Sequence, residues 1–146
     1  MCSSDLFPSH DIAKRARSLI DVPFVHQGRS FDGIDCVGLM AYAIRYDFDK
    51  IPPYPRDPYN SELENAMTAA FGPPLLLKPT IDQLREGDLA AMQYKGPIRH
   101  VGIVLNHPSI PGTLSLIHTD SMVEKVTEHI LDVKWLRRIE KVWRLG

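Results

Sequence analysis

The longest unbroken apolar stretch in the sequence covers residues 37–44, eight positions without a charged side chain. It is far shorter than the ~18 apolar residues that a bilayer-spanning helix needs. Asp35, of a residue type that caps helices, stands just before it, so the pattern predicts a helix from Asp35 or Cys36 to about Asp47. Because this helix is apolar on nearly all faces, the fold must bury it, and Cys36 lies on its first turn.

Two more helices are expected on either side of this one. Residues 9–20 carry an apolar stripe, and Ser61 with Glu64 forms a capping box that opens a helix to about Phe71. Residues 51–58 hold four prolines and predict an extended surface loop, which is either a docking surface or a lip of a cleft. Residues 1–8 are expected to be a flexible N-terminus. The apolar stripe of the helix expected at residues 9–20 consists of Ile12, Ala16, Leu19 and Ile20.

The chain after Gly72 reads as mainly β-structure. Turn residues separate short runs rich in β-branched and aromatic side chains. Strands are predicted at residues 89–94, 99–105, 114–119, 122–128 and 139–145, with a turn of helix around Trp135. At 146 residues, the whole chain 1–146 is expected to be a single domain.

Charge and composition exclude several classes of partner. The 17 Lys and Arg residues are balanced by 18 Asp and Glu residues, so the chain lacks the positive excess that nucleic-acid binding requires. A hydrophobic content of 44% indicates a soluble globular chain with no membrane span. The first residues have neither a basic nor an apolar segment, so no secretory signal is expected. With two cysteines, Cys2 and Cys36, no disulfide framework is expected.

Cys36 is the candidate nucleophile. A helix N-terminus beside an imidazolium lowers the pKa of a thiol and favours the reactive thiolate. The unbonded amides of the first turn, including that of Cys36, are placed to receive the oxyanion of a tetrahedral intermediate. The carboxylate of Asp35 opposes a thiolate at the same place, so a basic partner is required.

Two histidines on predicted strands are candidates for that partner. Gly102 next to His100 and Gly38 in the helix predict a close approach of helix and strand, which brings Cys36 within reach of His100. His118 ends the next strand and is placed to fix the tautomer of His100, with Asp120 as the competing orienting group.

The spacing of the candidate metal ligands in the sequence disfavours a metal site. Cys36, His100 and His118 lack the close ligand pair typical of structural zinc, so no metal and no cofactor is expected. His10, His107 and His129 are interpreted as surface residues.

Four blocks in order resemble the NlpC-type cell-wall cysteine peptidases, a papain-like family: GIDCVGL at residues 33–39, GDL at 87–89, RHVGIVL at 99–105 and LIH at 116–118. The segment PFVHQGR at residues 23–29 looks most like the branch associated with phage tails. The resemblance covers about residues 13–144.

This resemblance implies an α+β papain-like fold in which the nucleophile helix packs on a small antiparallel β-sheet. It implies Cys36 as nucleophile, His100 as general base and His118 as the residue that orients His100, with no metal. The implied reaction is hydrolysis of amide bonds in peptidoglycan stem peptides through a thioester, mostly between D-glutamate and a diamino acid.

The sequence departs from the housekeeping pattern of the family on the substrate side. Val37 stands where that pattern usually has Ser, and Phe24 and His26 stand where it usually has tyrosines, so hydroxyl contacts are lost there. His26 and Gln27 are the candidates to replace them, and with Asp35 they form the substrate-side set.

The resemblance also predicts where the chain works. A hydrolase without a signal is expected to be made in the bacterial cytoplasm and carried to the cell wall or periplasm in a phage tail tip or tail-like particle, with tail proteins as partners. The alternative is a structural tail-tip subunit whose papain-like domain is catalytically dispensable.

Overall fold

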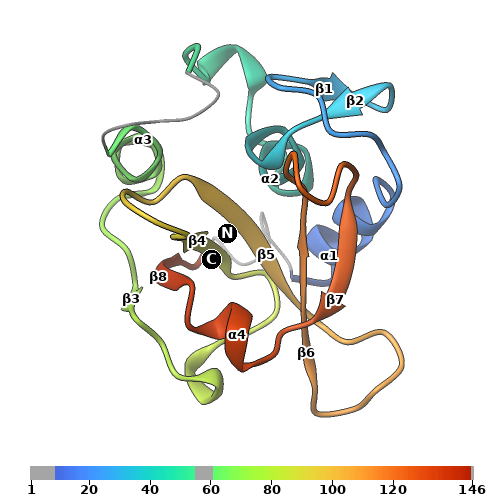
Figure 1. The fold of residues 1–146 in the computed structure, drawn as a ribbon, viewed down its shortest axis with the longest axis vertical. Helices are drawn as coiled ribbons and strands as arrows, with labels where there is room; N and C mark the ends of the chain where they lie inside the picture. The colour runs from blue at the N-terminus through green and yellow to red at the C-terminus, as the bar shows by residue number, and fades with distance from the viewer. Residues whose placement is uncertain (1–8, 55–60, 146) are drawn as a thin grey trace, which may run out of the picture.

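The computed structural model describes residues 9–54 and 61–145. Its centre is a six-stranded sheet in the order β3-β8-β4-β5-β6-β7, antiparallel throughout, and β1 and β2 form a separate hairpin (Figure 1). The helices are α1 (Ser9–Arg17), α2 (Cys36–Ile44), α3 (Glu62–Phe71) and α4 (Val133–Leu136), with short 3-10 turns η2 (Phe48–Lys50) and η3 (Ile81–Gln83). The strands are β1 (Arg29–Ser30), β2 (Gly33–Ile34), β3 (Leu76–Leu77), β4 (Leu89–Met92), β5 (His100–Asn106), β6 (Leu114–His118), β7 (Thr127–Ile130) and β8 (Ile139–Trp143).

Each face of the sheet covers its own group of buried side chains. On one face, Val101 and Ile103 of β5 pack with residues of α1 and α2. On the other face, Val104 of β5 and Leu116 of β6 pack with Trp135 of α4. Helix α2 is therefore buried against an antiparallel sheet, as expected, and the predicted α+β arrangement is confirmed.

Helix α2 begins where the sequence predicts. Asp35 is its N-cap and accepts a hydrogen bond from the backbone amide of Gly38 at 2.8 Å. The helix ends at Ile44, earlier than the predicted Asp47, because Arg45 adopts a left-handed conformation with φ 59°. As predicted, α2 is buried on most faces; the buried residues are Gly38, Leu39, Met40, Ala41, Ala43 and Ile44.

Gly38 and Gly102, predicted to let α2 and β5 approach each other, do not lie at the contact between these two elements, so this prediction is wrong. A Cβ on Gly38 would lie 2.5 Å from the carbonyl oxygen of Gly28, so this glycine admits the chain leading into β1. A Cβ on Gly102 would lie 2.8 Å from Cδ1 of Leu116, on the face of the sheet that α2 does not cover. Helix α2 instead reaches β5 through the apolar contacts with Val101 and Ile103.

The sequence does not predict the β1–β2 hairpin, strand β3 or the 3-10 turns η2 and η3. Further differences lie at the ends of elements. Helix α1 ends at Arg17, and Ile20, predicted on its buried stripe, is 39% exposed. Strand β7 begins at Thr127 and not at Met122, because the preceding residues form a turn in which Met122 is exposed. The predicted strand at 139–145 and the turn of helix around Trp135 are confirmed as β8 and α4.

Some expectations concern residues outside the described ranges. Residues 1–8, with Cys2, and residues 55–58 of the proline-rich segment lie there. The described part of that segment, residues 51–54, has no helix or strand, as predicted. None of the helices in residues 9–54 and 61–145 is long and apolar enough to cross a membrane.

Candidate active site

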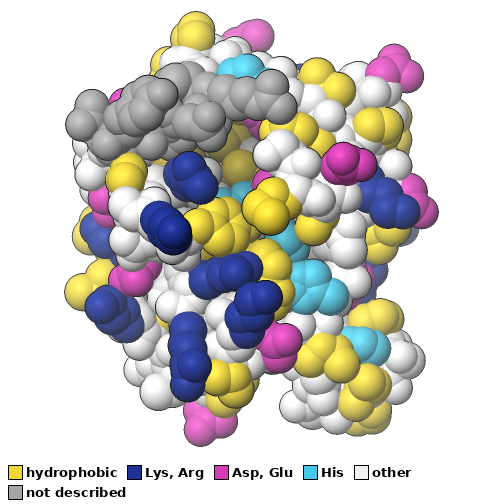
Figure 2. All heavy atoms as spheres, viewed as in Figure 1, with side chains coloured by type: hydrophobic (Ala, Val, Ile, Leu, Met, Phe, Trp, Pro, Cys, Tyr) yellow, Lys and Arg dark blue, Asp and Glu magenta, His cyan; other side chains and the backbone are white. Residues whose placement is uncertain are grey.

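A cavity of about 830 Å³ opens where α2 and β5 begin. Cys36 and His100 both line it, and residues 51–54 form part of its wall, so this segment lies at the lip of the cavity. Figure 2 shows histidine side chains between hydrophobic side chains and a group of Lys and Arg side chains on the face viewed. The site therefore sits at the end of the sheet, where the start of a helix meets the start of a strand.

The carboxylate of Asp35 holds together several segments of the cavity wall beside Cys36 by hydrogen bonds. Its carboxylate is buried, with only 3% exposed. Besides the Gly38 amide, it accepts hydrogen bonds from the backbone amide of Gln27 at 2.8 Å and from Nη1 of Arg29 at 2.9 Å. The hydroxyl of Tyr54 donates to it as well. Four donors of the same chain thus fill the acceptor positions of both oxygens, which makes Asp35 a positioning residue.

The two residues predicted to replace the lost hydroxyls lie side by side, with Nε2 of Gln27 3.3 Å from Nε2 of His26, but only one of them lines the cavity. His26 lines the cavity, with its ring 5.6 Å from that of Tyr54. Gln27 is not among the lining residues; its side-chain amide donates to the carbonyl oxygen of Tyr54 at 3.0 Å.

Tyr54 itself was missed by reasoning from sequence. Its hydroxyl accepts from Nη2 of Arg29 at 2.8 Å and donates to Asp35. The contact depends on the path of a proline-rich loop, for which local sequence carries no signal.

Behind His100 lies a chain of three imidazoles, which we call the histidine chain: His100, His118 and His129. Nε2 of His100 is 2.9 Å from Nδ1 of His118, and Nε2 of His118 is 2.8 Å from Nε2 of His129. Asp120 instead accepts from the hydroxyl of Tyr94 at 2.8 Å and from backbone amides of its own turn. His118 is therefore the hydrogen-bond partner of His100, while a carboxylate oxygen of Asp120 lies within 4.8 Å of both rings without a hydrogen bond to either among the described contacts.

The interpretation of His129 as a surface residue is wrong. It is half-buried and bonds to His118, because the antiparallel register of β6 and β7 pairs Leu116 with His129. The sequence predicts a strand that ends at residue 128, two positions before the end of β7 at Ile130. An extension of the predicted strand by one residue was the only signal that would have found it.

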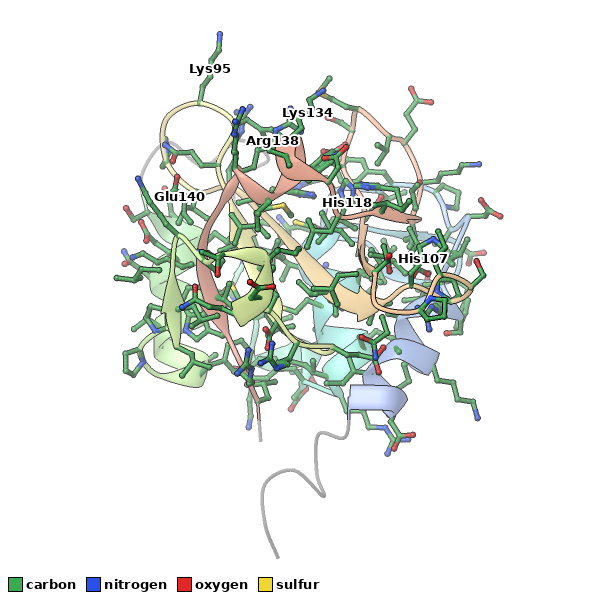
Figure 3. The ribbon with its side chains drawn as sticks, turned by 90° about the horizontal axis from the view of Figure 1, so that it is seen from below. Lys95, His107, His118, Lys134, Arg138 and Glu140 are labelled. Carbon is green, nitrogen blue, oxygen red and sulfur yellow. The ribbon has the colours of Figure 1, made fainter. Side chains whose placement is uncertain are left out.

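Aromatic rings enclose the histidine chain. The ring of Tyr94 stacks on His100 with centroids 5.7 Å apart, and Trp135 lies 4.6 Å from His118 and 5.0 Å from His129. The guanidinium of Arg138 in turn lies 4.4 Å from the ring of Trp135. Figure 3 shows Arg138 and His118 near each other within the molecule. With this packing His100 and His118 are buried, and His129 is half-buried.

Burial sets the charge state of the site. It lowers the pKa of His100 to about 4 and, with the neighbouring imidazoles of His100 and His129 disfavouring a second proton in the chain, that of His118 to about 3. Burial, with the Asp35 carboxylate adding to it, raises the pKa of the Cys36 thiol to about 12, although the amides of Val101 and Val37 favour the thiolate. The pKa of the Cys36 thiol is thus raised, in the opposite direction to the one expected from its place at the start of α2, and this favours a neutral thiol beside a neutral imidazole at rest.

The raised thiol pKa predicts slow alkylation of Cys36. In a Cys2→Ser background, we expect iodoacetamide to modify Cys36 at least about tenfold more slowly than a free thiol at neutral pH. Because the thiolate fraction grows about tenfold per pH unit below the pKa, the rate should keep rising into the alkaline range. Alkylation kinetics followed by mass spectrometry measure this, and a plateau already reached near neutral pH would contradict it.

The buried histidines also predict a loss of stability in mild acid. Their folded-state pKa values lie below the unfolded value of 6.5, so the unfolded state binds more protons as the pH falls from 6.5 towards about 4. Each then contributes a loss of about 1.4 kcal/mol per pH unit in that window.

Urea unfolding at several pH values measures this loss. His118→Asn, which removes one of the two ionisations, should make the slope of stability against pH shallower. An unfolding free energy that is constant across the window would show that the imidazoles are not held neutral by burial.

One set of side chains approaches the geometry of a metal site. Single ligand atoms of His100, His118 and Asp120 lie within 4.8 Å of one another. Both ring nitrogens of His118 are engaged with neighbouring imidazoles, so a metal bound there has to displace one of these hydrogen bonds. The arrangement is that of a hydrogen-bonded relay.

The fold and site together define a papain-like α+β protein, with a cysteine at the head of a buried helix and histidines on an antiparallel sheet. Residues 21–144 match the model of the NlpC/P60 family, and the chain belongs to this family. No curated protein sequence matches the chain.

Solved structures share the fold at low sequence identity. The NlpC/p60 domain of the peptidoglycan hydrolase SagA is 20% identical, with a TM-score of 0.56 over 93% of this chain and 97% of that one. An N-acetylmuramoyl-L-alanine amidase from Bacteroides uniformis is 15% identical, with a TM-score of 0.58 over 94% and 98%. An NlpC/P60 family protein from Bacillus cereus is 18% identical, with a TM-score of 0.60 over 93% of this chain but 39% of that longer one.

Proposed function

We propose that this protein is a cysteine peptidase or amidase that hydrolyses amide bonds in peptidoglycan stem peptides. The observation that carries the proposal is a single cavity lined by Cys36 and His100, with His118 hydrogen-bonded to His100 behind it. Membership of the NlpC/P60 family supports the substrate class, since structural neighbours include a peptidoglycan hydrolase and an N-acetylmuramoyl-L-alanine amidase.

The neutral resting pair defines the first chemical step. His100 takes the thiol proton as the sulfur of Cys36 attacks the amide carbonyl carbon, and the backbone amide of Cys36 donates to the oxyanion. The C–N bond then breaks, the amine leaves with the proton from His100, and a thioester remains on Cys36. Water then attacks the thioester and gives a proton to His100, which passes it to the sulfur as the C–S bond breaks, so that the carboxylic acid and the Cys36 thiol are released.

The cavity wall supplies groups that suit a stem peptide. Lys95, Arg99 and Arg138 line it and attract the carboxylates of D-glutamate and of a diamino acid. Thr119 also lines the cavity, and its buried hydroxyl oxygen has no hydrogen-bond partner among the described residues. That hydroxyl is available to a polar group of the substrate.

Digestion of purified sacculi and of soluble muropeptides tests the proposal. We expect the wild-type protein to release fragments whose combined mass equals that of the substrate plus one water, and mass spectrometry identifies the amide that was cut. Wild-type protein that leaves both substrates intact, alone and in assembled particles, would overturn the proposal.

We further propose that the hydrolase acts as a component of a phage tail tip or tail-like particle. The support is the sequence of residues 23–29, PFVHQGR, which resembles the branch of the family associated with phage tails. Detection of the chain in purified particles by mass spectrometry tests this, and its absence from particles that infect would contradict it.

The second candidate function is a structural tail-tip subunit with a dispensable site. It is favoured by the substrate-side departures, since Asp35 and the hydroxyl of Tyr54 are committed to contacts within the chain. Particles carrying Cys36→Ala separate the two functions: wild-type infectivity favours the structural subunit, and loss of cell-wall cleavage with intact assembly favours the hydrolase.

A further inference from the structure

The far end of the histidine chain is tied to a group that can only accept a hydrogen bond. Nδ1 of His129 lies 2.9 Å from the carbonyl oxygen of Ile130. A carbonyl oxygen has no proton to give, so Nδ1 of His129 carries the proton of this bond. In a neutral imidazole the other nitrogen, Nε2, is then an acceptor.

This acceptor sets the direction of both following hydrogen bonds. Nε2 of His118, 2.8 Å away, must donate to Nε2 of His129, which leaves Nδ1 of His118 as an acceptor. Nε2 of His100, 2.9 Å from that atom, must therefore donate to it. The proton of neutral His100 is thus on Nε2, and Nδ1 is the unprotonated nitrogen that takes the thiol proton.

The opposite direction requires an additional charge. If Nδ1 of His118 donated to His100, Nε2 of His118 would have to accept from Nε2 of His129. His129 would then carry protons on both nitrogens, because the bond to the Ile130 carbonyl still needs one. The guanidinium of Arg138, stacked on the Trp135 ring that covers the chain, opposes a further positive charge there, while the carboxylate of Asp120 favours one near His100 and His118. The direction from His100 to His129 is the one that keeps all three imidazoles neutral.

We propose that His129 is a positioning residue that, anchored on the Ile130 carbonyl, fixes the tautomer of His118 and through it that of the general base His100. The assignment rests on the proposed hydrolase function for its catalytic consequence, but the tautomers are properties of the folded chain. Trp135, which packs on both His118 and His129, holds the two rings in register.

Two substitutions of His129 test whether its ring acts as a hydrogen-bond acceptor for His118 or only fills space. His129→Leu removes the acceptor and frees the tautomer of His118. His129→Gln places an amide oxygen near the position of Nε2 and restores the acceptor. His107→Leu is the control for the loss of a histidine: His107 (Figure 3) lines a second pocket together with His129, but its ring accepts from the amides of Ser109 and Ile110 and it does not line the cavity that holds Cys36 and His100.

Nitrogen-15 NMR of labelled histidines reads the tautomers directly. In the wild type and in His129→Gln, we expect Nε2 of His100 to be protonated and Nδ1 to be unprotonated. In His129→Leu we expect a mixture, with kcat on muropeptides lower by about tenfold at unchanged KM, while His129→Gln and His107→Leu stay within about twofold of the wild type.

The outcomes distinguish this inference from the proposed function. A single, unchanged His100 tautomer in folded His129→Leu, or a wild type protonated on Nδ1 of His100, would overturn the role of His129. The expected tautomers in a protein that cuts no peptidoglycan would support the role of His129 and overturn the hydrolase proposal. Thermal unfolding of each variant confirms that the folded state is compared.

Discussion

Cys36→Ala should abolish hydrolysis of stem peptides, with a fall in kcat/KM of about 10⁴-fold or more. The reason is that the sulfur forms the covalent bond to substrate, and neither His100 nor the helix amides can replace it. The α2 helix should persist, because its cap is the side chain of Asp35 and because Cys36 is only partly buried against the core. Release of soluble muropeptide fragments measures the activity.

Cys2→Ser is the matched control for the loss of a cysteine. It should leave activity within about twofold of the wild type, since Cys2 has no place in the proposed chemistry. Cys36→Ser keeps the shape of the side chain but offers a weaker nucleophile, so we expect it to be nearly as inactive as Cys36→Ala. Cleavage retained in either Cys36 variant would rule out the thioester mechanism.

Asp35→Ala should be the most destabilising single change near the site, by about 3–5 kcal/mol. It leaves Arg29, with a guanidinium held 2.9 Å from the carboxylate, without that partner. It also removes the acceptor for the backbone amides of Gln27 and Gly38. Chemical denaturation monitored by circular dichroism measures the loss of unfolding free energy.

Asp32→Ala provides a comparison within the same β1–β2 hairpin. Asp32 is exposed, so its removal should change the unfolding free energy by less than about 0.5 kcal/mol. A cost for Asp35→Ala no greater than that for Asp32→Ala would show that the carboxylate does not hold the cavity wall together.

The parts of the site that could be predicted are those that depend on residues close together in the sequence. The cap at Asp35 and the apolar run behind Cys36 are adjacent in the chain, and the structure places the start of α2 there. His100 and His118 fall on strands whose pattern is clear, and the hairpin register of β5 and β6 brings them together. The resemblance of the sequence blocks added the family, which the match over residues 21–144 shows.

The parts that could not be predicted depend on contacts between distant segments. Tyr54 reaches Asp35 across 19 positions, through a loop whose path no local pattern encodes. His129 joins the histidine chain only because β7 begins later and ends later than its pattern suggests. The sign of the shift in the Cys36 pKa was also beyond reach, because it depends on burial by the surrounding fold.

Trapping the acyl-enzyme tests the central claim most directly. Wild-type protein and Cys36→Ala are mixed with muropeptides, quenched in acid within the first turnovers, and analysed by intact-protein and peptide mass spectrometry. We predict that the wild type carries the acyl part of the substrate on the peptide that contains Cys36, and that Cys36→Ala carries none. Cleavage of muropeptides without such an adduct, continuing in Cys36→Ala, would contradict the account.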